Sequence, residues 1–102
     1  MEKIYVVCWA SGSTDDHGNA HAYSGTAGAY RDKADALKAL EIYRDETLQE
    51  VYDDVDPDGD MPEERARVQV YGSITDEYFE IDYILGTDPV ELYMGISETT
   101  LA

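Results

Sequence analysis

The sequence predicts an α+β fold in which a small antiparallel sheet of three to five strands packs on one long helix. Three observations predict it: a central run with apolar residues three and four apart, three alternating segments after this run, and one apolar segment before it. The expected order is β(β)αβββ, with one strand or a hairpin before the helix. At 102 residues the chain is expected to form a single domain, 1–102.

The segment Ile4–Ala10 is rich in β-branched and aromatic residues, which indicates a buried strand. Residues 11–20 contain Gly12, Gly18 and Asn19 and have the composition of a loop or hairpin turn. The following segment, His21–Tyr30, has small residues and two tyrosines, and we expect it to pair back on the first strand as a short, irregular second strand.

The central helix is expected over Lys33–Val55. Asp32 has the side chain of an N-cap, and the Pro- and Gly-containing segment 56–62 cannot continue a helix. The apolar stripe of this helix repeats at spacings of three and four, which predicts one face packed on a sheet. The stripe consists of Ala36, Leu37, Leu40, Tyr43, Thr47, Leu48, Val51, Tyr52 and Val55.

Three strands are expected after the helix, over Arg67–Ile74, Tyr78–Leu85 and Val90–Ser97. Apolar residues alternate in each, so one sheet face should pack on the helix and the other should face water. The links between them are short enough for antiparallel hairpins. Tyr71, Tyr78 and Tyr93 fall on the face away from the helix. There they could form a protein interface in which tyrosine stacks on arginine, or be ordinary residues of an amphipathic strand.

The chain carries 23 acidic and 7 basic residues, for a formal charge of −16. Direct nucleic-acid binding needs clustered Lys and Arg, and an anionic membrane surface attracts the same residues, so neither is expected. A single cysteine, Cys8, excludes an intramolecular disulfide scaffold, and no apolar run approaches 18 residues. We therefore expect a cytoplasmic protein. No catalytic motif is present, so we expect no enzyme.

The negative charge is concentrated in two parts of the chain. Residues 41–64 contain eleven acids and one base, and residues 68–102 contain seven acids and no base. One interpretation is imitation of duplex DNA, with the acids occupying the basic channel of a nucleic-acid-binding protein. The other is a solvated, salt-adapted surface on a protein-interaction domain. The candidate partner-binding residues are Glu41, Asp45, Glu46, Glu50, Asp53, Asp54, Asp56, Asp58 and Asp60, followed by Glu80, Asp82 and Glu91.

A resemblance supports the first interpretation. A first strand of the type Lys3-Ile4-Tyr5-Val6-Val7, a charged turn, an Ala- and Leu-rich helix and a short meander resemble the small acidic proteins of phages and mobile elements. Some of those are anti-CRISPR or anti-restriction inhibitors, and several act as DNA mimics. The resemblance implies a CRISPR or restriction effector as partner, in the host cytoplasm. It rests on pattern and charge, so no functional residue is carried over.

A calcium site is the alternative function. Asp54, Asp56, Asp58 and Asp60 match positions 1, 3, 5 and 7 of an EF-hand loop, and Gly59 matches the turn position 6. Position 12, where the loop takes a bidentate Glu, is Arg65. The match predicts weak Ca²⁺ binding, and the alternative is a solvated acidic turn. No other cofactor is expected.

Overall fold

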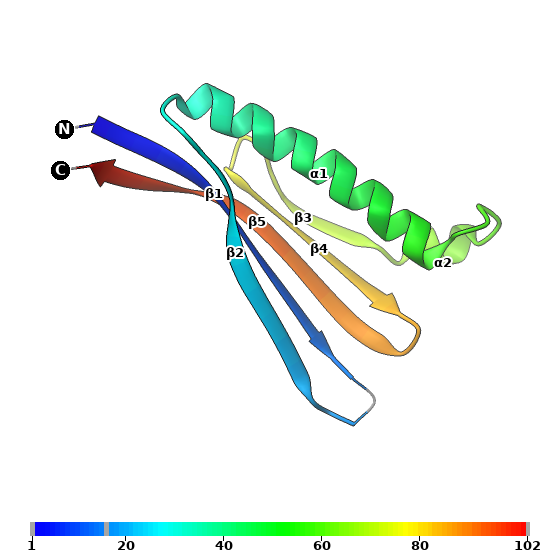
Figure 1. Ribbon diagram of the computed structural model, residues 1–102. Helices are drawn as coiled ribbons and strands as arrows, with labels where there is room; N and C mark the ends of the chain where they lie inside the picture. Colours follow the sequence, from blue (N-terminus) through cyan, green and yellow to red (C-terminus); the bar gives the residue numbers. More distant parts are fainter. Residues whose placement is uncertain (1, 16, 102) are drawn as a thin grey trace.

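The computed structural model describes residues 2–15 and 17–101, and these residues form an α+β fold with a five-stranded antiparallel sheet and one long helix (Figure 1). The predicted fold class is thereby confirmed. The elements are β1 (Glu2–Thr14), β2 (Ala20–Tyr30), α1 (Lys33–Val55), α2 (Pro62–Ala66), β3 (Gln69–Ser73), β4 (Tyr78–Leu85) and β5 (Asp88–Leu101).

The strands lie in the order β2-β1-β5-β4-β3, and every neighbouring pair is antiparallel. The first and last strands of the chain pair along most of their length, from Glu2 opposite Leu101 to Ser13 opposite Val90. This pairing joins the N-terminal hairpin to the C-terminal meander. The β4–β5 turn is tight because Gly86, with φ of 67°, directly follows the paired residue Leu85.

Helix α1 begins and ends at the predicted residues. The Asp32 carboxylate accepts a hydrogen bond from the Ala34 backbone N–H at 3.1 Å, which satisfies one of the free donors of the first turn. The last turn closes with the Asp56 N–H donating to the Tyr52 carbonyl at 2.9 Å, and Pro57 follows. The helix lies across one face of the sheet (Figure 1).

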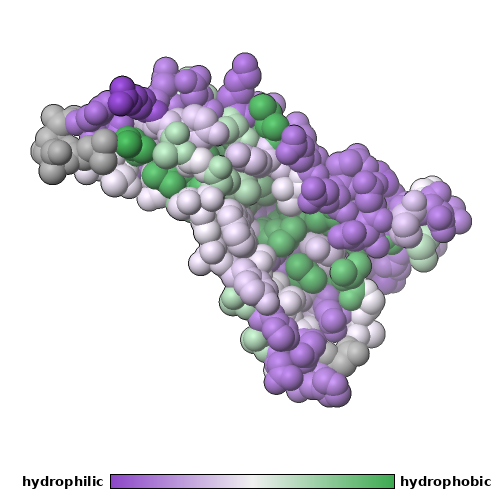
Figure 2. Space-filling view, viewed as in Figure 1, coloured by the Kyte–Doolittle hydropathy of each residue, from purple (hydrophilic) through white to green (hydrophobic). Residues whose placement is uncertain are grey.

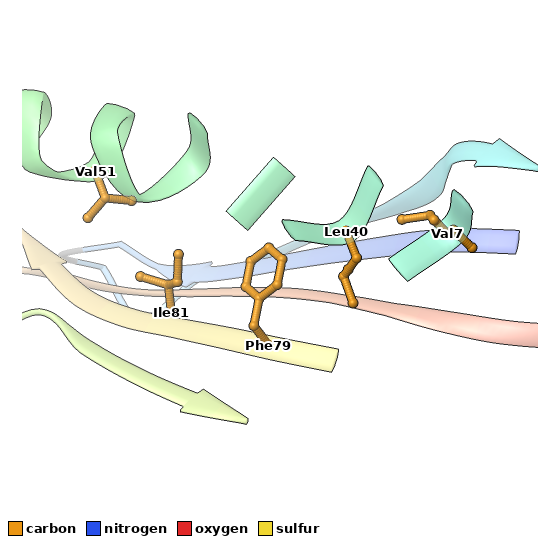
Figure 3. Close-up of a cluster of buried hydrophobic side chains, with 6 residues drawn as sticks. Val7, Leu40, Val51, Phe79 and Ile81 are labelled. Atoms are coloured by element: carbon orange, nitrogen blue, oxygen red, sulfur yellow. The ribbon is translucent and has the colours of Figure 1, made fainter. Parts of the chain in front are cut away.

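The core lies between α1 and that sheet face (Figure 3). Phe79 and Ile81 alternate along β4 and point at the helix, where they meet Leu40 and Val51. Burying a side chain of this size contributes about 1.5–3 kcal/mol to folding. The buried apolar residues are Val7, Ala36, Leu40, Val51, Phe79 and Ile81. Apart from Val7, all of them belong to positions that the sequence assigned to the helix stripe or to the inner face of a strand.

The structure differs from the expectation in the extent of several strands and in one added helix. β1 continues to Thr14 through residues expected to form a loop, β3 covers only Gln69–Ser73, and β5 covers Asp88–Leu101 instead of Val90–Ser97.

Strand β2 covers Ala20–Tyr30, one residue more than expected, and is irregular as expected, because its register with β1 shifts after Val7. It forms although its composition is poor in strand-forming residues, because pairing with β1 supplies its backbone hydrogen bonds. A bulge after Val7 leaves Ala27 outside the register, and the Tyr43 hydroxyl donates to the Ala27 carbonyl at 3.3 Å. Helix α2 was not predicted, because it is a single turn that begins at Pro62.

Candidate functional site

The acids of α1 form an exposed surface on the outer side of the helix. We define the helix surface as Glu41, Asp45, Glu46, Glu50 and Asp53, and all five residues are exposed. Hydrophilic side chains accordingly cover α1 and the loop after it in Figure 2. Arg44 is the base within this stretch, and its guanidinium already pairs with Asp45 at 3.1 Å and with Glu41 at 4.0 Å. These acids therefore lie away from the core.

The acids gather at the end of α1 where negative charge is least favourable. A helix C-terminus carries about half a negative charge, so Lys and Arg are favoured in its last turn. In α1 the last turn contains no basic residue and holds Asp53 and Asp54 instead. The nearest base comes from α2, where Arg65 lies 4.3 Å from the centre of the Tyr52 ring. The helix itself therefore supplies no base at this end, and the cation beside it comes from Arg65 of α2.

The loop predicted to bind calcium is arranged around one buried carboxylate. Asp56 is 3% exposed, accepts from the Met61 N–H at 2.9 Å, and lies 3.9 Å from Arg65. Asp54, Asp58 and Asp60 are exposed. Among the described residues, no group of three or more ligating side chains is placed to hold a metal ion. Asp56 is thus removed from the set of surface acids, and calcium binding stays a prediction.

The acids of the strands lie on the other side of the sheet. Because residues directly opposite in neighbouring strands share a face, three cross-strand rows can be followed from β3 through β4 to β5. The rows are Ser73–Tyr78–Gly95, Tyr71–Glu80–Tyr93 and Gln69–Asp82–Glu91. They lie opposite to the core residues Phe79 and Ile81. We define the tyrosine face as Tyr71, Tyr78, Tyr93, Glu80, Asp82 and Glu91.

The tyrosine face places aromatic rings beside crowded carboxylates. Tyr78 and Tyr93 stack with ring centres 6.0 Å apart and planes 24° apart. Glu80 is half-buried, and burial, followed by the charges of Asp82 and Glu91, raises its pKa above the usual value. Asp82 stands directly opposite Glu91, a cross-strand pair of like charges that opposes folding. The chain therefore holds at this face carboxylates that lack a cation.

The sequence offered the nine acids of the helix and loop first and the three strand acids second, and the structure places these two groups on different surfaces. The helix surface and the exposed acids of the loop lie on the α1 side, whereas Glu80, Asp82 and Glu91 lie on the helix-free side. A flat partner can contact one of these surfaces at a time. The sequence analysis also overlooked Gly95, which is buried beneath the Tyr93 ring. Gly95 and Tyr93 are two positions apart in β5, and this spacing in the sequence predicts that both lie on the same face of the strand.

Most of the basic side chains are neutralised within the chain. Six of the seven Lys and Arg residues pair with acids, three of them near the start of α1, one in the middle of α1 and two near α2: Lys3 with Glu98, Arg31 with Glu2, Lys33 with Glu77, Arg44 with Asp45, Arg65 with Asp56 and Arg67 with Glu64. The acids of the tyrosine face, and most of those on the helix surface and the loop, lie outside these pairs.

An apolar groove of about 270 Å³ lies between α1 and the sheet. The β1–β2 hairpin extends past the helix (Figure 1), and Trp9, Leu92 and Met94 line the groove and are partly uncovered. Glu50 of the helix surface stands at its rim. The groove thus adjoins the helix surface.

No protein-family model, no curated protein and no solved structure matches this chain. Within residues 2–15 and 17–101, no helix is both long enough and apolar enough to cross a membrane. The function is therefore argued from the two acidic surfaces.

Proposed function

We propose that this protein is a non-enzymatic acidic inhibitor that binds a positively charged nucleic-acid-binding protein, such as a CRISPR or restriction effector, in place of duplex DNA. The observation that carries the proposal is the accumulation of acids toward the C-terminal end of α1 without a base in the last turn. Such an arrangement lowers the stability of the free protein by a few tenths of a kcal/mol per unfavourable contact. A cationic partner would relieve this cost on binding.

The size and charge of the molecule suit this role. Its longest dimension is 50 Å, which is the length of about 15 base pairs at 3.4 Å each. The net charge of −16 over that length is about one negative charge per 3 Å, roughly half the density of duplex DNA. A protein with this net charge would steer a basic protein toward it, and the complex would lose affinity as salt is added.

The test is capture from host lysate on the immobilised protein, followed by elution with a short DNA duplex. We expect a nucleic-acid-binding protein to be captured and the duplex to displace it. Capture of nothing, or of a protein that the duplex leaves in place, would contradict the proposal.

Matched variants then locate the surface. Glu46→Gln with Glu50→Gln removes two charges from the helix surface, and Asp35→Asn with Glu98→Gln removes two from the other end of the molecule. We expect the first pair to weaken the captured complex about tenfold, equivalent to about 1.4 kcal/mol, and to flatten its dependence on salt. The control pair should change the affinity much less. Equal losses in both pairs would show that total charge, and not this surface, determines binding.

A further inference from the structure

The tyrosine face is an open side of the sheet with a specific arrangement of groups. In its central row, Glu80 of β4 lies between Tyr71 of β3 and Tyr93 of β5. The next row places Asp82 opposite Glu91. The three tyrosines are 37–45% exposed, although each is large and aromatic. A ring on either side of a carboxylate, with two further carboxylates one row away, offers both flat apolar area and negative charge.

The rings are held in place by their neighbours. Gly95 gives the Tyr93 ring room to lie over the strand, and Tyr78 stacks on Tyr93. The Tyr71 hydroxyl donates to the side-chain oxygen of Gln69 on the same strand. Aromatic side chains that are fixed before binding lose little conformational entropy when a partner arrives.

The carboxylates lack a positive partner within the described residues. One carboxylate oxygen of Asp82, Oδ1, is inaccessible to solvent and receives no hydrogen bond. Glu80 and Asp82 are close enough to raise the pKa of Glu80 through their mutual contact, after the larger effect of burial. A cation with several hydrogen-bond donors, placed over this row, would offset the repulsion between the carboxylates and would supply a donor for the unpaired oxygen of Asp82.

The same chain shows how such groups accommodate a cation elsewhere. At the end of α1, the Arg65 guanidinium lies over the ring of Tyr52 at 4.3 Å, and its Nη1 is 3.9 Å from the Asp56 carboxylate. A phenol ring and a carboxylate thus flank one arginine. The tyrosine face also combines rings and carboxylates, and the neighbouring base, Arg67, pairs with Glu64 at 3.4 Å and not with Asp82 or Glu91.

We propose that the tyrosine face binds an arginine side chain presented by a partner protein. The guanidinium is planar, so it can stack on a tyrosine ring while its N–H donors reach two carboxylate oxygens. A lysine ammonium is compact and strongly hydrated, and it lacks the planar surface that stacks and the fork that bonds in parallel, so it gains less from the same groups. Anionic lipid headgroups and nucleic-acid phosphates are repelled by Glu80, Asp82 and Glu91. The arginine site lies on the opposite side of the sheet from the helix surface, so it goes beyond the proposed function. An experiment can therefore reject the arginine site without rejecting the proposed function, and the reverse.

The test is a titration of the ¹⁵N-labelled protein with two capped tripeptides, Gly-Arg-Gly and Gly-Lys-Gly, which carry the same charge. We expect saturable amide shifts on β3, β4 and β5 with the arginine peptide, and at least fivefold weaker binding of the lysine peptide. Equal affinity for both peptides would overturn the proposal. So would shifts confined to α1 and its loop, because they would show general attraction to the acidic helix.

Matched variants complete the test. Glu91→Gln removes one exposed charge from the tyrosine face, and Glu63→Gln removes one from α2. Tyr71→Ala removes a 45% exposed ring from the face, and Tyr23→Ala removes a 65% exposed ring from β2. We expect Glu91→Gln and Tyr71→Ala each to weaken the arginine peptide at least threefold, and the two controls to leave its affinity unchanged.

Thermal melting of each variant verifies that the sheet remains folded. If Tyr71→Ala unfolds, Glu91→Gln decides, because Glu91 is exposed and its loss leaves the stacked rings in place. Equal effects of test and control variants would overturn the proposal. Glu46→Gln with Glu50→Gln should leave arginine-peptide binding unchanged, whichever way the proposed function is decided.

Discussion

Gly72 determines where the Tyr78 ring can lie. Its φ is 79°, a backbone conformation that residues with a side chain rarely adopt. A Cβ at this position would also lie 2.6 Å from the Tyr78 ring and 2.7 Å from the Tyr78 carbonyl oxygen. The carbonyl belongs to the backbone of β4 and cannot move aside as a side chain can. Two separate costs therefore oppose any larger residue here.

We expect Gly72→Ala to lower the free energy of unfolding by about 2 kcal/mol or more. Gly86→Ala is the matched control, since Gly86 has a φ of 67° but open space around it, and should cost only about 1 kcal/mol. Urea denaturation of both variants measures the difference. Equal losses of unfolding free energy in the two variants would show that the structure relieves the contact with the Tyr78 carbonyl at no cost in stability.

At the scale of elements, α1 combines a favourable start with an unfavourable end. Asp35 in the first turn faces the positive end of the helix dipole, whereas Asp54 in the last turn adds to the negative end. Natural sequences depart from such local rules mainly where function requires it. We therefore expect the acids at the end of α1 to lower the stability of the free protein and to contribute to the binding of a partner.

We expect Asp54→Lys to raise the free energy of unfolding by about 0.3–1 kcal/mol at low ionic strength, and Asp35→Lys to lower it by a similar amount. Both variants change the charge by the same amount, so general relief of self-repulsion cannot produce opposite signs. Urea denaturation at low salt is the measurement. A gain in stability from both variants would show that net charge outweighs the dipole.

An element could be predicted from the sequence when the residues that determine it lie close together in the chain. Both ends of α1 were predicted because Asp32 caps the first turn and Pro57 follows the last, within a few residues of the helix itself. β2 was predicted as an irregular strand that pairs back on β1, and both features are confirmed, but the position of its bulge at Ala27 depends on the pairing with β1 and not on its own composition. The one-turn helix α2 was missed for lack of any periodic signal.

At the scale of the whole molecule, the net charge of −16 is spread over an elongated body of 50 × 29 × 18 Å. Six of the seven basic residues are already used in pairs with acids, so the remaining acids repel one another. Added salt should screen this repulsion once the Debye length falls to about 8 Å, near 0.15 M.

We expect the melting temperature to rise by about 4–8 °C between low salt and about 0.2 M KCl, which corresponds to roughly 1 kcal/mol of relieved repulsion. It should then level off. Thermal melting followed by circular dichroism over a KCl series measures this. A melting temperature that stays constant below 0.2 M and climbs steadily into molar KCl would instead favour the salt-adapted interpretation of the charge.

The sequence by itself determined the helix, the alternation of the meander strands and the acidic surface of α1, because periods of 3.6 and 2 are properties of neighbouring residues. Only the tertiary structure decided that β1 pairs with β5, that Asp56 is buried beneath Arg65 and Met61, and that Tyr71, Glu80 and Tyr93 form one row. It also placed the two acidic surfaces on opposite sides of the sheet. These features depend on contacts between residues far apart in the chain, which no local pattern specifies.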